Sequence, residues 1–158
     1  MKRMWSKNEL KEAVKSTPKD ITTLVDAQGH ERFVEGDIIA NSSPITGLTQ
    51  TYGKWSLSGT HLLIVLGLSA LNECVIPSSK LFKTKDLPKW IYDKVVPLFG
   101  TIYVDKKAIS LYADNGSSQV IQSFLAKQDN ELYLDFGTLT LTLDRQCRVE
   151  FDLLIDND

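Results

Sequence analysis

The chain has 158 residues and a mass of 17.7 kDa, and 42% of its residues are hydrophobic. A chain of this length buries roughly 70% of the surface that its unfolded form exposes, so we expect one folded unit that needs neither disulfide nor metal. Lys and Arg total 18 against 20 Asp and Glu, a net charge of −2. That balance lacks the basic surplus of nucleic-acid-binding proteins, so we expect no nucleic-acid partner.

The charge is distributed unevenly along the chain. Residues 1–19 contain six Lys or Arg and two Glu, a net charge of +4, which leaves 12 basic and 18 acidic residues, a net −6, in the remainder. A basic N-terminal segment before an acidic body predicts that an acidic protein surface contacts the first residues.

Neither a membrane nor a secretory role is expected. Lys7, Glu9 and Lys11 interrupt any apolar stretch of the length that a signal peptide requires. The most apolar run, Leu62 to Leu68, is much too short to span a bilayer as a helix. We therefore expect a protein that is made in the cytoplasm and has no membrane partner.

The N-terminus carries a helix start signal. Ser6 and Glu9 have the spacing of a capping box, and Trp5 and Leu10 are placed to form the hydrophobic staple that accompanies it. The sequence predicts a short helix over residues 7–15.

This predicted helix has a narrow apolar stripe beside a basic one. Because so short a helix is barely stable alone in water, we expect it to dock on its own domain, on a symmetry mate or on another protein. A solvated, fraying terminal helix is the alternative. The candidate partner-binding residues are Trp5, Lys7, Leu10, Lys11, Val14 and Lys15.

After residue 20 the pattern changes to short strands. A hairpin is expected around Gly29, and one or two helical turns are expected over residues 87–94, between Pro88 and Pro97. Asp105-Lys106 and Asp129-Asn130 are expected as turns. Strands are predicted at 21–25, 32–34, 52–57, 61–68, 102–104, 108–113, 119–127, 131–136, 138–143 and 148–155.

This spacing of short strands favours a mainly β fold, a β-sandwich of jelly-roll-like topology with a short N-terminal helix. We expect residues 1–36, the helix and the first hairpin, to be an attachment segment. Residues 37–158 are expected to form the β-sandwich body.

No residue set predicts catalysis, a metal site or a cofactor. His30 is expected to be solvated in a hairpin loop and His61 to be structural, since neither lies in a metal-ligand spacing. No complete catalytic triad or phosphate-binding loop is present in the sequence. Cys74 and Cys147 lie far apart and are expected to be buried free thiols. We therefore expect a protein that is not an enzyme.

The Trp and Tyr residues leave an alternative open. If two or three of them shared an exposed face, they could stack on sugar rings, although core or interface positions are commoner for such residues. The candidates are Tyr52, Trp55, Trp90, Tyr92, Tyr103, Tyr112 and Tyr133.

Four blocks of the sequence resemble small virion structural proteins of tailed bacteriophages, of the head-fibre, decoration or tail-fibre kind. They are Met4-Trp5-Ser6-Lys7-Asn8-Glu9-Leu10, Tyr52-Gly53-Lys54-Trp55-Ser56-Leu57-Ser58-Gly59, Leu87-Pro88-Lys89-Trp90-Ile91-Tyr92-Asp93-Lys94 and Val149 to Asp158. The resemblance implies a location in the virion, an N-terminal anchor on the capsid or another virion protein, a displayed β body and a homotrimer. The absence of heptads or fibrous repeats excludes a long shaft and favours a fibre knob or capsid decoration. A carbohydrate-binding module that binds host-surface glycans during host attachment is the alternative function.

Overall fold

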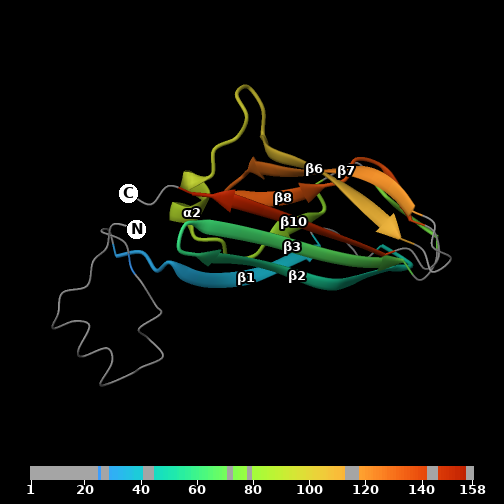
Figure 1. Cartoon of the computed structure of the whole chain (residues 1–158), viewed down its shortest axis with the longest axis horizontal. Helices are drawn as coiled ribbons and strands as arrows, with labels where there is room; N and C mark the ends of the chain where they lie inside the picture. Colours follow the sequence, from blue (N-terminus) through green and yellow to red (C-terminus); the bar gives the residue numbers. More distant parts are fainter. Residues whose placement is uncertain are drawn as a thin grey trace, which may run out of the picture.

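The computed structural model describes residues 25, 29–40, 45–70, 73–77, 80–112, 118–141 and 146–155. The predicted helix over residues 7–15 and the six candidate partner-binding residues lie outside this part of the chain. Within it, the mainly β prediction is confirmed, and the strands form a nearly closed sheet that encloses the core (Figure 1).

Two three-stranded meanders make up most of this sheet. The first is β1 (Phe33–Ala40), β2 (Leu48–Ser58) and β3 (His61–Ala70), and the second is β6 (Tyr103–Tyr112), β7 (Ser118–Gln128) and β8 (Glu131–Asp135). β10 (Gln146–Leu154) joins β3 to β6, and β5 (Phe82–Thr84) joins β8 to β1, so the ring closes. A separate two-stranded sheet pairs β4 (Cys74–Ile76) with β9 (Leu139–Leu141). All paired strands are antiparallel.

The core follows from the alternation of side chains along the strands. β10 sends Cys147, Val149 and Phe151 inward and leaves Arg148 and Asp152 exposed. In β3, Leu62, Ile64, Leu66 and Leu68 are almost completely buried, and each such side chain contributes about 1.5–3 kcal/mol on transfer from water. β3 is thus the central strand of the core.

Tight turns connect neighbouring strands within each meander. Asp129 and Asn130 both have positive φ angles, 57° and 63°, as a two-residue type I′ turn between β7 and β8 requires. Gly59, with a φ of 66°, turns the chain from β2 into β3. Gly29 also has the predicted positive φ, and its loop is closed by the bridge between Val25 and Glu31.

The prediction of a turn at Asp105-Lys106 is wrong. β6 runs without interruption from Tyr103 to Tyr112, and the register with β7 shifts between Tyr103 and Asp105. The extra residue is accommodated as an irregularity within the ladder, and the Asp105 carboxylate accepts the Lys106 N–H at 2.8 Å. The polar pair Asp105-Lys106, which is expected as a turn, instead lies beside a bulge in a continuous strand.

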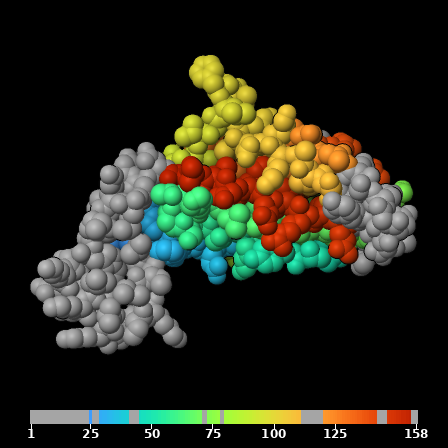
Figure 2. Space-filling model, in the orientation of Figure 1, coloured from blue at the N-terminus to red at the C-terminus, as the bar shows by residue number. Residues whose placement is uncertain are grey.

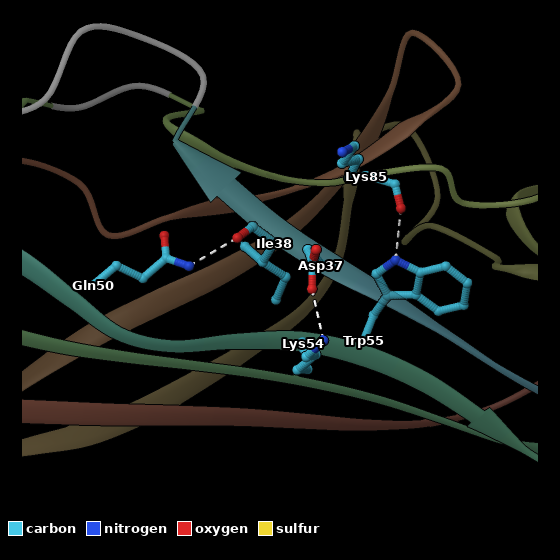
Figure 3. Close-up of polar contacts among 6 residues, drawn as sticks. All are labelled: Asp37, Ile38, Gln50, Lys54, Trp55 and Lys85. Atoms are coloured by element: carbon cyan, nitrogen blue, oxygen red, sulfur yellow. Dashed lines mark hydrogen bonds and ion pairs between the residues drawn. The ribbon is translucent and has the colours of Figure 1, made fainter.

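Polar side chains satisfy the backbone where β1 leaves β2 and begins to pair with β5. Asp37 is the last residue of β1 that pairs with β2, and Ile38 is the first that pairs with β5. The Gln50 amide donates to the Ile38 carbonyl at 2.8 Å, and the Trp55 indole N–H donates to the Lys85 carbonyl at 2.9 Å (Figure 3). These side chains replace ladder hydrogen bonds at the point where the sheet closes.

The helix predicted near Pro88 is present as α2 (Lys89–Lys94). The Pro88 carbonyl accepts hydrogen bonds from Ile91 and Tyr92, at 3.0 and 3.1 Å, and Val95 returns to an extended conformation. Among the described residues, no helix has the length and apolar character needed to cross a bilayer.

Candidate protein-interaction site

Helix α2 is fixed to one end of the barrel by buried side chains and by the contacts of its aromatic residues. Ile91 is fully buried and Val95 nearly so. The Trp90 ring stacks on His30, with centroids 4.5 Å apart and planes 6° apart, and the buried Arg32 guanidinium lies 4.8 Å from the same ring. Stacking and cation–π contacts with a buried cation hold the helix in one position.

Lys127 of β7 fixes the end of the helix. Its ammonium group donates to the Val95 carbonyl at 2.6 Å and lies 4.5 Å from the centre of the Tyr92 ring. The Lys127 backbone N–H also donates to the Ile102 carbonyl at 2.7 Å. Both ends of the segment between Val95 and Ile102 are therefore attached to the same strand.

Between these two fixed points, residues 96–101 form a projecting loop with internal hydrogen bonds. Leu98 donates its N–H to the Tyr103 carbonyl at 2.7 Å, and Thr101 donates its N–H to the Leu98 carbonyl at 3.0 Å. Gly100, third in the resulting four-residue turn, has a φ of 75°, the feature that distinguishes a type II turn. The Thr101 hydroxyl lies 2.9 Å from the Leu98 carbonyl, so the turn has a defined conformation.

The side chains that this loop presents are apolar and face solvent. Phe99 is completely exposed, Val96 is 78% exposed and Leu98 is 58% exposed. Figure 2 shows the loop, in yellow, standing away from the rest of the surface. Adjacent exposed apolar side chains on an ordered element are typical of a protein contact, in which an aromatic side chain can act as an anchor. The projecting loop is the strongest candidate interaction site among the described residues.

The two histidines lie in different surroundings, one against an aromatic ring and one beside a carboxylate. His30 is half-buried against Trp90, so its prediction as a solvated loop residue is wrong, because the ring of a helix far along the chain covers it. His61 is exposed and its Nδ1 lies 3.1 Å from a carboxylate oxygen of Asp152. Among the described residues, no three His, Cys, Asp or Glu side chains are grouped so that they could hold a metal ion.

The aromatic residues do not form a sugar-stacking face in the part of the chain that is described. Trp55 and Tyr133 are buried, whereas Trp90, Tyr92 and Tyr103 are half-buried. The Tyr112 side chain lies outside the described part, and among the Trp and Tyr side chains that are described Tyr52 is the exposed one, with the Arg148 guanidinium 6.0 Å from its ring centre. Most of these described rings thus lie in the core or support neighbouring elements, as the sequence favours, and do not form an exposed face for stacking on sugars.

The two cysteines are free and buried, as predicted. Burial raises the pKa of the Cys147 thiol to about 11, although a backbone hydrogen bond from Leu68 acts in the opposite direction. Burial also raises the pKa of Cys74. Both thiols therefore stay protonated and unreactive near neutral pH.

The apolar residues of the projecting loop were not among the predicted site residues. An apolar run in a sequence is read as core, and only its flanking residues indicate otherwise. Pro97 and Gly100 enclose Leu98 and Phe99, and a Pro-x-x-Gly spacing is a turn signal that places the two residues between them at a loop tip.

Comparisons with known proteins give fold similarities of low score. No protein-family model matches the sequence, and no curated protein matches it significantly. The solved distal domain of the mouse adenovirus 2 fibre has a TM-score of 0.43 at 10% identity, and 85% of each chain is covered.

Two further viral proteins are similar at a TM-score of 0.33. The reovirus attachment protein sigma1, solved with alpha-2,3-sialyllactose, is 8% identical over 86% of this chain and 75% of its own. The bovine atadenovirus type 4 fibre head is 9% identical over 77% of this chain and 98% of its own. All three TM-scores lie below 0.5, so these similarities alone do not establish a common fold or function.

Proposed function

We propose that this chain is a non-enzymatic structural protein of a tailed-bacteriophage virion, a head fibre, capsid decoration or fibre knob. It assembles as a homotrimer, attaches through residues 1–36 and displays the β body outward. The observation that carries the proposal is the projecting loop, because its apolar side chains Phe99, Val96 and Leu98 are exposed on an element held by its own hydrogen bonds, an arrangement typical of a contact with other proteins.

The sequence blocks that resemble small virion proteins support a virion as the place where this protein contact is made. One of them, residues 87–94, contains helix α2, whose Trp90 and Tyr92 hold the base of the projecting loop. The block that resembles such proteins thus has a structural role at the candidate interaction site.

Charge supports attachment by the N-terminal segment. Residues 1–19 carry a net +4 and the rest of the chain a net −6, so an acidic surface on the particle attracts the first segment and repels the body. Such a surface orients the protein with its β body away from the particle. Lys7, Lys11 and Lys15 make the electrostatic contact, and Trp5, Leu10 and Val14 make the apolar one.

The test is incorporation into particles of the virus that encodes the chain. Deleting residues 1–19 should leave the far-ultraviolet circular dichroism and melting temperature of the body unchanged, yet remove the protein from purified particles. Replacing Lys7, Lys11 and Lys15 with alanine should weaken incorporation. Replacing the exposed Lys85, Lys106 and Lys107 of the body is the charge-matched control and should not. Normal incorporation of the deletion variant would overturn the proposal.

A further inference from the structure

The chain enters the described fold beside the helix that holds the projecting loop. His30 stacks on Trp90 of α2, the Arg32 guanidinium lies 4.8 Å from the same ring, and Val25 is bridged to Glu31 between them in sequence. β1 starts at the next residue, and Figure 1 shows it beginning at the end of the barrel that carries α2. The proposed attachment segment therefore joins the body next to the base of the loop.

The loop carries no charge, so an acidic surface does not repel it. Residues 95–104 contain no Asp, Glu, Lys or Arg, whereas residues 20–158 as a whole have a net charge of −6. The exposed side chains near the tip, Val96, Leu98 and Phe99, are apolar. An acidic partner that attracts the basic residues 1–19 can therefore also approach this loop closely.

The loop is too small to form an interface alone. A buried aromatic side chain covers about 150–250 Å², so Phe99 and its apolar neighbours supply well under the roughly 800 Å² per partner of a stable interface. A second, tethered contact from the same chain adds area, and binding of either contact then favours the other. At full extension the chain from Lys15 to Val25 spans about 35 Å, roughly the diameter of a small domain, so one partner protein can meet both contacts.

We propose that the projecting loop is the second contact of the attachment interface. When residues 1–19 bind an acidic virion protein, Phe99 enters an apolar pocket on that same protein. This inference rests on the proposed function and names the residue through which the body itself meets the partner. The hydrogen bonds from Leu98 to Tyr103 and from Thr101 to Leu98 already hold the loop that presents Phe99, so little ordering is needed on binding.

Photo-crosslinking in purified particles tests whether the two contacts share one partner. The full chain carries p-benzoylphenylalanine in place of Phe99 in one variant and in place of Trp5 in another. Mass spectrometry should identify the same acidic virion protein in the crosslinked products of both. The matched control carries the probe in place of Val120, which is 65% exposed near the opposite end of β7 from Lys127, and should give no such crosslink. A crosslink from position 99 to another copy of this chain, to a different virion protein or to nothing would overturn the inference.

Substitution measures what the loop contributes. Phe99→Ser should reduce incorporation into particles roughly tenfold or more at an unchanged melting temperature, because it removes an exposed aromatic anchor. Phe99→Leu should retain most of the incorporation, and Val120→Ser should retain all of it. Normal incorporation of Phe99→Ser would overturn this contact yet leave attachment through residues 1–19 standing. Normal incorporation after deletion of residues 1–19 would instead overturn the proposed function.

Discussion

The indole ring of Trp55 fills the space in which a side chain on Gly36 would lie. The two residues are directly paired across β1 and β2, and a β-carbon built on Gly36 would lie 2.6 Å from Cε2 and 2.7 Å from Cζ2 of the ring. The ring is 1% exposed and donates its N–H to the Lys85 carbonyl (Figure 3). Gly36 therefore allows the β1–β2 pair to close over the core while Trp55 supports the connection that follows β5.

Gly36→Ala should destabilise the body by about 2–3 kcal/mol, because the new methyl group displaces the indole from its hydrogen bond and its packing. In a chain of this size that corresponds to a fall in melting temperature of roughly 5–10 °C. Differential scanning calorimetry measures it. Thr49→Ala, at an exposed position of β2, is the control and should change little. A variant as stable as the wild type would show that the ring can move at no cost.

Asn130→Ala should destabilise the β7–β8 hairpin by about 1 kcal/mol, because alanine has a β-carbon that disfavours the positive φ of this position. Asn130→Gly should be neutral or slightly stabilising, because glycine adopts that conformation without strain. Urea unfolding of the two variants distinguishes them. Equal stability of both would mean that the turn adopts another conformation in solution.

Cys147 should make stability fall as the pH rises above 9. The folded chain keeps the thiol protonated until its pKa of about 11, whereas the unfolded chain releases the proton at the ordinary thiol pKa. The unfolded state then binds fewer protons, so stabilisation present below pH 8.5 is lost between about pH 9 and 11, with a total of about 2–3 kcal/mol.

The comparison that isolates this effect is the unfolding free energy at pH 8 and pH 10.5 for the wild type and for Cys147→Ala. Lysine and tyrosine titrations affect both proteins, so only the difference between their pH slopes reports on the thiol. The wild type should lose more stability than the variant. Identical slopes would indicate that the thiol is solvated in the folded state.

Breaking the Lys54–Asp37 ion pair should have little effect on stability. The two charged atoms lie 2.8 Å apart, and this hydrogen bond lowers the pKa of Asp37 and raises that of Lys54. Both side chains are nevertheless well exposed, so water and salt screen the interaction. Asp37→Asn should unfold at nearly the wild-type urea concentration in low and high salt. A marked, salt-dependent loss would show that the pair anchors β1 to β2 at the last residue where the two strands pair.

Local patterns predict the individual elements of this fold better than its closure. Pro88 and the Asp129-Asn130 pair determine backbone conformations by themselves, so the sequence predicts a helix and a turn there, and both are present. β5 has only three residues, with Lys83 between two buried neighbours, and three residues are too few to establish an alternation. This strand nevertheless closes the sheet by pairing with β1 on one side and β8 on the other. Both partners are distant in sequence, so the local pattern does not predict the pairing.

For the projecting loop, the spacing of Pro97 and Gly100 indicates a turn, but the sequence does not show that every apolar side chain beside the turn faces solvent. Apolar residues in a sequence do not reveal whether they face inward, and Val95 and Val96 are adjacent valines of which one is buried and one exposed. Only the anchoring of Val95 by Lys127, 32 residues away, sends the next residues into solvent. The candidate attachment residues Trp5, Lys7, Leu10, Lys11, Val14 and Lys15 lie outside the described residues and remain predictions.

The mass of the purified full-length chain in solution tests the central claim most directly. Light scattering coupled to gel filtration should give three times 17.7 kDa for the wild type. A wild-type protein that elutes as a monomer across the micromolar range would contradict the proposed homotrimer.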